Sequence, residues 1–240
     1  MRVVSCVPSL SELAEELLHG CLVGRTRYCI APESNQKLPK IGGTKDLDTD
    51  RIIRMQPDLV LSVKEENEKD QIECLQNAGL QVEIFDIRRL QDAIAMVEKC
   101  GILLQNPGKA DVLASAMRRI GDARPPVRGS VLYFIWQKPL MVAGEDTFIG
   151  DLLRLSGFQN LAPAGARYPL LPDIADMQKL KPDYIFLSSE PYPFRDKHRS
   201  YFQNIFPESA VFCVDGSIFS WYGSRTSRLP DYLSQTLKIG

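Results

Sequence analysis

The sequence predicts an α/β protein of two similar lobes, each with a small central parallel sheet flanked by helices, joined by one long backbone helix, with a ligand cleft between the lobes. Apolar runs of strand length alternate with helix-length segments in both halves of the 240 residues, a pattern typical of parallel sheets. Residues 90–124 interrupt that alternation with apolar side chains at helical spacing. We therefore expect an N-terminal lobe at 1–89, a connecting helix at 90–124 and a C-terminal lobe at 125–240.

In the first lobe we expect strands at 3–7, 21–24, 58–63 and 82–85, and helices between them at 9–20, 49–56 and 67–78. The strand at 58–63 is almost continuously apolar, as a parallel strand covered on both faces should be. Ser9, with Glu12 three residues later, has the spacing of a capping box, so the first helix is predicted to begin there.

Residues 90–122 form one long helix or two collinear ones, perturbed around Asn106-Pro107-Gly108, because proline lacks the amide donor that a helix needs. The second lobe is expected to resume with strands at 131–135, 184–187 and 211–214 and a helix at 147–156. The lobes also share a short pattern, Pro57-Asp58-Leu59-Val60 in the first and Pro182-Asp183-Tyr184-Ile185 in the second.

Composition excludes several classes of function. The formal net charge is −1, without the positive excess that a nucleic-acid backbone requires. No apolar run approaches the roughly 20 residues that cross a bilayer, so direct membrane insertion is not expected. The six cysteines form no CxxC pair and are predicted to be reduced thiols among apolar neighbours.

The opening residues bear on location. Met1-Arg2 leads directly into the strand-like segment 3–7, whereas an export signal needs a basic start, an apolar stretch and a cleavage site. As the sequence stands, a cytoplasmic location is predicted; a trimmed export signal would make it periplasmic.

Sites of enzyme and metal chemistry are poorly represented. Only His19 and His198 are histidines, which excludes a metal site built on several imidazoles. Neither a GxGxxG motif nor a P-loop is present. We predict no catalytic residue, no metal ligand and no covalently bound cofactor.

Polar and aromatic side chains gather instead after the predicted strands, where parallel α/β sheets bind ligands. The candidate ligand-binding residues are Tyr28, Lys45, Glu66, Asn67, Trp136, Arg167, Tyr168, Glu190, Tyr192, Phe194, Trp221, Tyr222 and Arg225. The aromatic rings would stack on a planar ligand, the cations would pair with its acidic groups, and the remaining polar groups would bond to amides or hydroxyls. Structural alternatives stay open: Glu66 as a solvated helix start, Trp136 as core, and the loop 221–225 as packed on its own aromatics.

Other segments of the sequence carry a resemblance to a known family: Val4–Glu12, Leu22–Gly24, Ile41–Gly43 and the two Pro-Asp patterns. They resemble the helical-backbone metal receptors, the binding proteins for vitamin B12 and siderophores of ABC transporters. The resemblance implies a substrate-binding protein, not an enzyme, that holds a corrinoid (cobalamin-like) ligand or another metal chelate such as a ferric siderophore. It further implies that Tyr28, Tyr168, Trp221 and Tyr222 line the cleft.

The resemblance also implies docking to an ABC transporter permease through one acidic residue in each lobe. Asp50 matches in the first lobe, whereas the equivalent position in the second is Ala175, with Asp176 beside it. Two other functions remain open: a cytoplasmic enzyme that uses Glu66 and Glu190 as acid and base on a small metabolite, and an intracellular ligand sensor.

Overall fold

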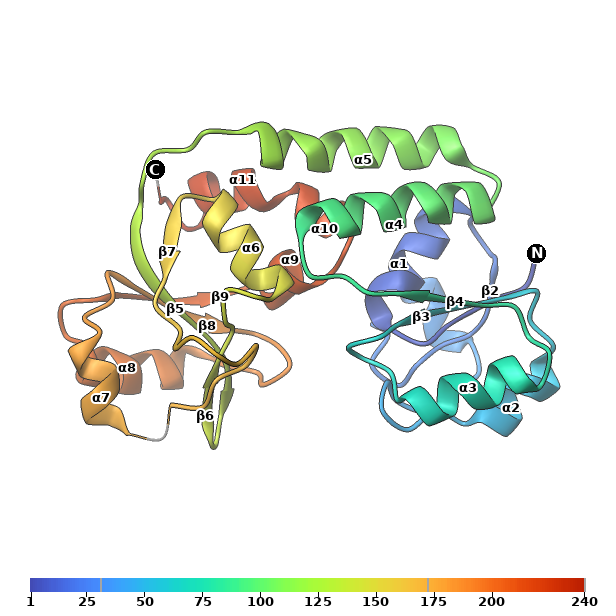
Figure 1. The fold of residues 1–240 in the computed structure, drawn as a ribbon, viewed down its shortest axis with the longest axis horizontal. Coiled ribbons are helices and arrows are strands. Elements are labelled where there is room, and N and C mark those ends of the chain that lie inside the picture. Colours follow the sequence, from blue (N-terminus) through green and yellow to red (C-terminus); the bar gives the residue numbers. More distant parts are fainter. Residues whose placement is uncertain (31, 172, 240) are drawn as a thin grey trace. The chain divides into compact units, whose positions relative to one another are not determined.

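The computed structural model describes residues 1–30, 32–171 and 173–239, which fold into two compact units (Figure 1). Unit 1 comprises Met1–Ile87, Gln91–Ala116 and Trp221–Ser224. Unit 2 comprises Arg88–Leu90, Met117–Ser220 and the chain from Arg225 onward. Each unit is built on its own sheet of mainly parallel strands, which confirms the predicted α/β class. The segment 90–124, expected to stand apart as a connector, is divided between the two units.

The sheet of unit 1 has four parallel strands in the order β2-β1-β3-β4. They are β1 (Val3–Ser5), β2 (Leu22–Gly24), β3 (Leu59–Val63) and β4 (Val82–Phe85). Helices α2 (Thr49–Met55) and α3 (Lys69–Asn77) lie side by side on one face, and α1 (Pro8–Leu17) covers the other (Figure 1). A short 3-10 helix, Glu33–Lys37, follows β2. The central strand β3 is buried along its whole length, as its apolar sequence predicted.

Helix α1 begins one residue earlier than predicted. Its N-cap is Val7, which offers no side-chain cap, and Pro8 occupies the first turn. Proline suits that position because its ring presets φ and the missing N–H would have no helical partner there. The predicted capping box at Ser9 and Glu12 is therefore wrong, and the Ser9 side chain is buried.

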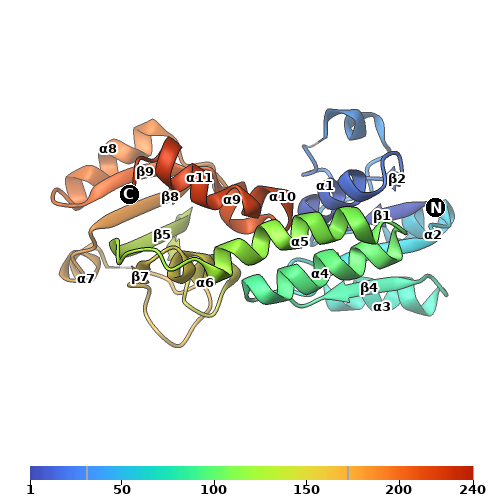
Figure 2. The ribbon, with the colours of Figure 1, turned by 90° about the horizontal axis from the view of Figure 1, so that it is seen from above.

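The prediction of one long helix or two collinear ones over 90–122 is also wrong. Two helices, α4 (Leu90–Leu103) and α5 (Pro107–Asp122), run antiparallel and side by side (Figures 1 and 2). The chain reverses at Gln105, which adopts a left-handed φ of 58°. Pro107 then starts a new helix instead of disturbing an existing one. A Cβ at Gly101 would lie 2.3 Å from that of Ala110, so the helices meet closely beside the turn.

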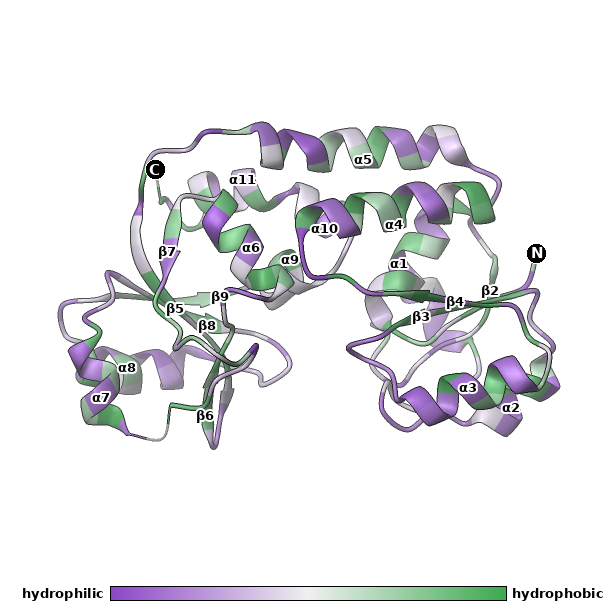
Figure 3. Ribbon diagram, viewed as in Figure 1, coloured by the Kyte–Doolittle hydropathy of each residue, from purple (hydrophilic) through white to green (hydrophobic). Residues whose placement is uncertain are grey.

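The sheet of unit 2 is built around β5 (Gly129–Gln137). Its first residues pair in parallel with β7 (Phe158–Asn160), and its last residues form an antiparallel hairpin with β6 (Leu140–Val142). On the other side lie β8 (Tyr184–Ser188) and β9 (Ala210–Val214), both parallel. The helices of this unit are α6 (Phe148–Leu155), α7 (Ile174–Lys179), α8 (Asp196–Ile205), α9 (Gly216–Ser220), α10 (Ser224–Ser227), α11 (Leu229–Asp231) and a final π-helical turn, Tyr232–Thr236. Coloured by hydropathy, the helices show alternating polar and apolar stretches, as expected for elements with one face in a core (Figure 3).

The two Pro-Asp patterns have the same structural role in the two units. Gln56 and Lys181, which precede them, both have left-handed φ angles, of 46° and 45°. The carboxylate of Asp58 accepts a hydrogen bond from the N–H of Arg2 at 2.7 Å, and that of Asp183 accepts one from the N–H of Ser130 at 2.7 Å. Each aspartate thus fixes the start of its own strand, β3 or β8, beside the start of the neighbouring strand, β1 or β5.

Candidate ligand-binding site

The topology of each sheet singles out one crevice. In unit 1 the chain moves from β1 to β2 on one side and later to β3 on the other, so the loops after β1 and β3 flank the point where the direction of winding reverses. In unit 2 the loops after β5 and β8 hold the same position. Open parallel sheets bind ligands at the carboxyl ends of their strands at this point, and many of the predicted residues lie there.

Asn67 organises the crevice of unit 1. Its side-chain oxygen accepts a hydrogen bond from the Val63 N–H at 2.9 Å. Its amide nitrogen donates to the carbonyls of Cys6 at 3.1 Å and Thr44 at 3.0 Å. The residue is buried, so it ties together the loops after β1 and β3 and the Gly42–Thr44 turn. The structure therefore supports a positioning role for Asn67.

Lys45 and Glu66 lie on these tied loops. The Lys45 ammonium donates to the carbonyl of Glu65 at 3.0 Å and forms an ion pair with Glu68 at 3.2 Å. The N–H of Glu66 donates to the Val63 carbonyl at 3.1 Å, and the residue is half-buried. Lys45 is thus tied to the loop after β3, on which Glu66 also lies.

Tyr28 is an exposed ring with a fixed setting. It is 54% exposed, and the Arg27 guanidinium lies 5.9 Å from the ring centroid. Arg27 is held in turn by an ion pair with Asp46. A Cβ at Gly43 would lie 3.0 Å from the ring and 2.4 Å from the Asp46 carboxylate, so glycine gives the ring and the ion pair their space.

In unit 2, Trp136 is the prominent exposed aromatic side chain at a strand end. It lies near the end of β5, is 40% exposed, and pairs in register with Met141 of β6. Met141 pairs on its other side with Leu170, which is 50% exposed. Residues in register on adjacent strands point to the same face of a sheet. Trp136, Met141 and Leu170 therefore form one apolar row, here called the Trp136 row.

Tyr192 braces this row from the loop after β8. Its ring meets the Trp136 indole edge-on at 5.7 Å, and its N–H donates to the Ile135 carbonyl at 3.3 Å. Its hydroxyl donates to the Gln137 side chain and lies 3.3 Å from Nε2 of His198. Phe194 packs on the other side of Tyr192 at 4.8 Å but is buried in the core. Phe194 therefore supports Tyr192 from beneath.

Arg167 and Tyr168 lie just before Leu170 of the row. The Arg167 guanidinium lies 5.9 Å from the Tyr168 ring, and its Nε donates to the Asp146 carbonyl at 2.8 Å. Their segment is held against β6 and the residues that follow it by backbone hydrogen bonds from Gly144 to Arg167 and from Val142 to Pro169. A positive charge and a second aromatic ring thus lie in the segment that leads into Leu170 of the Trp136 row.

Glu190 and Arg225 contact the short helix α9, which follows β9. The Glu190 carboxylate accepts a hydrogen bond from the Ser220 hydroxyl, and Arg225 donates to the Ser217 hydroxyl at 2.7 Å. A Cβ at Gly216 would lie 2.6 Å from Cγ of Glu190, so glycine at the start of α9 leaves the space that the Glu190 side chain occupies. Glu190 belongs to unit 2, whereas Glu66 belongs to unit 1.

Trp221 and Tyr222 are packed inside the fold, at 6% and 7% exposure. Their segment belongs to unit 1, where Gly223 approaches Leu13 of α1 and Leu113 of α5. This burial favours the structural alternative for the loop over ligand stacking.

The predicted docking residues both lie in first turns of corresponding helices. Asp50 is exposed on α2, and Asp176 is exposed on α7 with an ion pair to Lys179 at 2.7 Å.

Across the three described ranges, no group of three or more His, Cys, Asp or Glu side chains is placed to hold a metal ion. Among the same residues, none of the helices is both long and apolar enough to span a bilayer.

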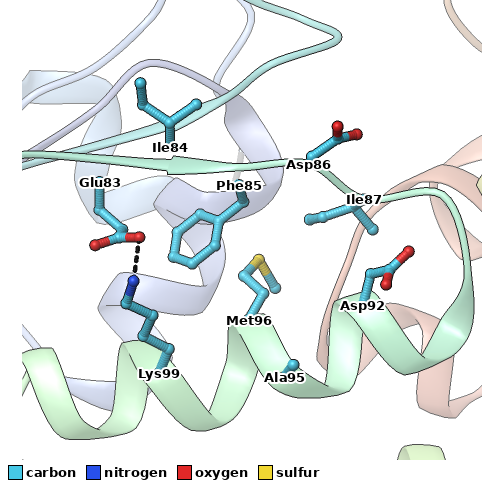
Figure 4. A pocket seen from close by; sticks show the side chains of 9 residues that line it. All are labelled: Glu83, Ile84, Phe85, Asp86, Ile87, Asp92, Ala95, Met96 and Lys99. Carbon is cyan, nitrogen blue, oxygen red and sulfur yellow. Dashed lines mark hydrogen bonds and ion pairs between the residues drawn. The ribbon is translucent and has the colours of Figure 1, made fainter.

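A separate groove lies between β4 and α4 of unit 1 (Figure 4). Phe85, Ile87 and Met96 line its apolar part, and the ion pair between Glu83 and Lys99 closes one end. None of the predicted ligand-binding residues lines this groove.

Sequence reasoning missed three residues that shape the Trp136 row, namely Gln137, Met141 and Leu170, and it did not connect His198 with Tyr192. Strand β6 is only three residues long and follows Lys138-Pro139, so it gave no recognisable strand pattern. Apolar and aromatic residues on both sides of Pro139 were the sequence feature from which a hairpin could have been predicted.

Comparison with known proteins identifies the class of the chain. The family model of the periplasmic binding proteins matches residues 3–208, so the chain belongs to that family. The vitamin B12-binding protein of Pectobacterium carotovorum subsp. carotovorum (strain PC1) is 23% identical over 168 residues, which cover 67% of this chain and 61% of that protein. The chain thus spans less than two thirds of the length of that relative.

Two solved structures are similar over nearly their whole length. The periplasmic vitamin B12 binding protein BtuF of Vibrio cholerae has a TM-score of 0.80 at 18% identity, covering 99% of this chain and 96% of the other. A periplasmic heme binding protein from Pseudomonas aeruginosa has a TM-score of 0.77 at 25% identity, covering 97% and 90%. The predicted resemblance and the binding-protein class are confirmed, and neither comparison supports the enzyme alternative.

Proposed function

We propose that this binding protein holds a metal chelate: a corrinoid is the first candidate, a haem, which is likewise a flat macrocycle, is the second, and a ferric siderophore is the third. The observation that carries the proposal is the Trp136 row: an exposed indole at a strand end, in line with Met141 and Leu170 and braced by Tyr192. Trp136 and Leu170 are exposed and Met141 is half-buried, and adjoining apolar groups at a protein surface are a common mark of a contact site.

The chemistry around the row suits such a ligand. Aromatic and aliphatic side chains gain free energy by covering a large flat apolar face. Arg167, beside Tyr168, offers a positive charge for the carboxylate or phosphate groups on the rim of the macrocycle. The relatives named above bind vitamin B12 or heme according to their descriptions, and both are flat macrocycles with polar edges.

Calorimetric titration with cyanocobalamin, cobinamide, hemin and a panel of ferric siderophores tests the proposal. We expect saturable binding by at least one of them below about 10 μM, or roughly −7 kcal/mol. Trp136→Ala should weaken binding by about tenfold or more, because it removes most of the apolar contact. Tyr201→Ala is the matched control, since Tyr201 is a similarly exposed aromatic residue on α8. Absence of binding across the panel would refute the proposal.

In unit 1 we propose that Tyr28, Lys45 and Glu66 contribute to binding, with Asn67 as their positioning residue. Tyr28→Ala is expected to weaken binding while leaving the unfolding midpoint unchanged, because the ring is more than half exposed. An unchanged affinity in Tyr28→Ala would remove the residue from the site.

An ABC transporter permease is the partner that we propose, with docking through Asp50 and Asp176. Both lie at corresponding places in the repeated helix–strand unit and both are exposed. Charge reversal at both positions should abolish stimulation of the permease ATPase and leave ligand affinity unchanged; stimulation that survives would exclude these residues. The predicted cytoplasmic location remains a prediction that cell fractionation would test against the periplasmic alternative.

A further inference from the structure

A directed chain of hydrogen bonds connects helix α8 to the end of β5. The N–H of Arg195 donates to Nδ1 of His198 at 2.9 Å. With Nδ1 as the acceptor, the neutral imidazole carries its hydrogen on Nε2, which then donates to the Tyr192 hydroxyl 3.3 Å away. That hydroxyl donates onward to the side-chain oxygen of Gln137. Every group has one consistent role, and the chain requires a neutral His198.

The setting of His198 makes a neutral ring the favoured form. The residue is 7% exposed, and the rings of Tyr192 and Phe194 both lie 5.5 Å from its own. Asp196 in the first turn of α8 is negative, but the charges that act on His198 are those of Lys197 and Arg195, both positive. Burial lowers the pKa of His198 below its usual value, and Lys197 lowers it further.

Protonation would break the chain at its first bond. An imidazolium carries hydrogens on both nitrogens, so Nδ1 would face the N–H of Arg195 as donor against donor. The ring would have to turn away, and the Tyr192 hydroxyl would lose its hydrogen bond from Nε2 and keep only the one to Gln137. Because the Tyr192 ring meets the Trp136 indole at 5.7 Å, its position bears directly on that of the indole.

We propose that His198 is a positioning residue for the ligand-binding surface: through Tyr192 it holds the Trp136 indole in place, and protonation of His198 releases it. The effect on ligand binding rests on the proposed function, in which the ligand contacts the indole. The effect of His198 on the position of the indole concerns the ligand-free protein alone. The consequence for binding is an affinity that falls on the acid side of the ordinary histidine pKa of about 6.5.

Fluorescence of the ligand-free protein tests the proposal. The chain has two tryptophans, so the spectrum of Trp136→Phe, subtracted from that of the wild type at each pH, isolates the Trp136 emission. We expect that emission to shift to the red, and its quenching by acrylamide to increase by about twofold or more, below pH 6.5, while the far-ultraviolet circular dichroism stays constant.

Two variants separate positioning from general structure. His198→Gln keeps an acceptor for the Arg195 N–H, as glutamine does in capping boxes, but cannot titrate, so it should keep the neutral-pH spectrum and lose the acid transition. Tyr192→Phe keeps the ring and removes the hydroxyl, so its Trp136 emission should already be red-shifted at pH 7.5. If circular dichroism shows that one variant does not fold, the other still tests the hydrogen-bond chain from Arg195 to Gln137, here called the relay.

An acid transition that persists in His198→Gln, or one that coincides with loss of circular dichroism, overturns the proposal. Ligand titration at pH 7.5 and 5.5 then separates this inference from the proposed function. If the fluorescence transition is found but no macrocycle binds, the proposed ligand is wrong and the relay stands. If a macrocycle binds with the same affinity at both pH values and the transition is absent, the relay is wrong and the ligand stands.

Discussion

The carboxylate of Asp183 accepts hydrogen bonds from both the N–H and the hydroxyl of Ser130, each at 2.7 Å, and the N–H of Asp183 donates back to that hydroxyl at 3.0 Å. Three bonds between two residues fix the start of β8 to the start of β5. In unit 1, Asp58 and Arg2 make the corresponding contact with two bonds: the N–H of Arg2 donates to the Asp58 carboxylate at 2.7 Å, and the N–H of Asp58 donates to the Arg2 carbonyl at 2.8 Å. The repeated Pro-Asp pattern thus marks the same joint in both sheets.

Acid sensitivity should follow from this joint. The hydrogen bonds from Ser130 lower the pKa of Asp183 below its usual value. A lowered folded-state pKa means that the stabilisation is present above the unfolded pKa of about 3.9 and is lost as the pH falls through the folded value. Asp183→Asn should therefore lower the free energy of unfolding at pH 7 by less than about 1 kcal/mol, because the side chain is exposed and solvent screens its charge, and it should flatten the loss of stability between pH 5 and 3. Urea unfolding across this range measures both effects. Ser130→Ala and the double variant complete a cycle, and additive losses would contradict the coupling.

Asn67 should matter more for stability than an exposed neighbour does. Asn67→Ala removes three hydrogen bonds and leaves the Val63 N–H and the carbonyls of Cys6 and Thr44 without them in a buried place, so a loss of about 2–3 kcal/mol is expected. Glu68→Gln, on the exposed residue next to it, should cost less than about 0.5 kcal/mol. Equal losses in chemical unfolding of the two variants would show that the amide does not tie the loops.

The helical hairpin allows a matched pair of glycine substitutions. At Gly101 a Cβ would lie 2.3 Å from that of Ala110, whereas at Gly108 nothing lies within 4 Å. Gly101→Ala should lower the free energy of unfolding by about 1–3 kcal/mol because the helices must separate. Gly108→Ala should raise it by up to about 1 kcal/mol, since alanine favours a helix. Stabilisation by both substitutions would be inconsistent with the close approach of α4 and α5.

The local elements were predictable because their signals are local. Strand β4 has the predicted bounds, and the helix expected at 147–156 appears as α6 with Thr147 capping the N–H of Gly150. The antiparallel turn at Gln105 was not predictable, because a proline that starts a helix and one that disturbs a helix look alike in sequence. Which aromatic residues are exposed depends on distant partners: Gln137 and Tyr192 are 55 residues apart, and no periodicity reveals such a pair.

The six cysteines should differ sharply in reactivity. All are free thiols, and Cys74 is the exposed one. Burial raises the pKa of Cys6, Cys21 and Cys100 to about 12, so these thiols carry almost no reactive thiolate at neutral pH. Labelling of the native protein with a maleimide should modify one thiol rapidly, and Cys74→Ser should remove that fast phase. A fast phase that survives the substitution would mean that another cysteine is accessible.

The two tryptophans should respond to substitution in opposite ways, because one is exposed on β5 and the other is packed into unit 1. Trp221→Ala empties a buried site and should cost about 3–5 kcal/mol of unfolding free energy. Trp136→Ala, with 40% of the residue already exposed, should cost much less stability and act mainly on ligand affinity. Parallel measurement of unfolding and of binding to whichever macrocycle proves active separates the two effects. If Trp221→Phe, which keeps most of the packing, weakened binding as strongly as Trp136→Ala, then Trp221 would contact the ligand and the buried loop would have to open to admit it.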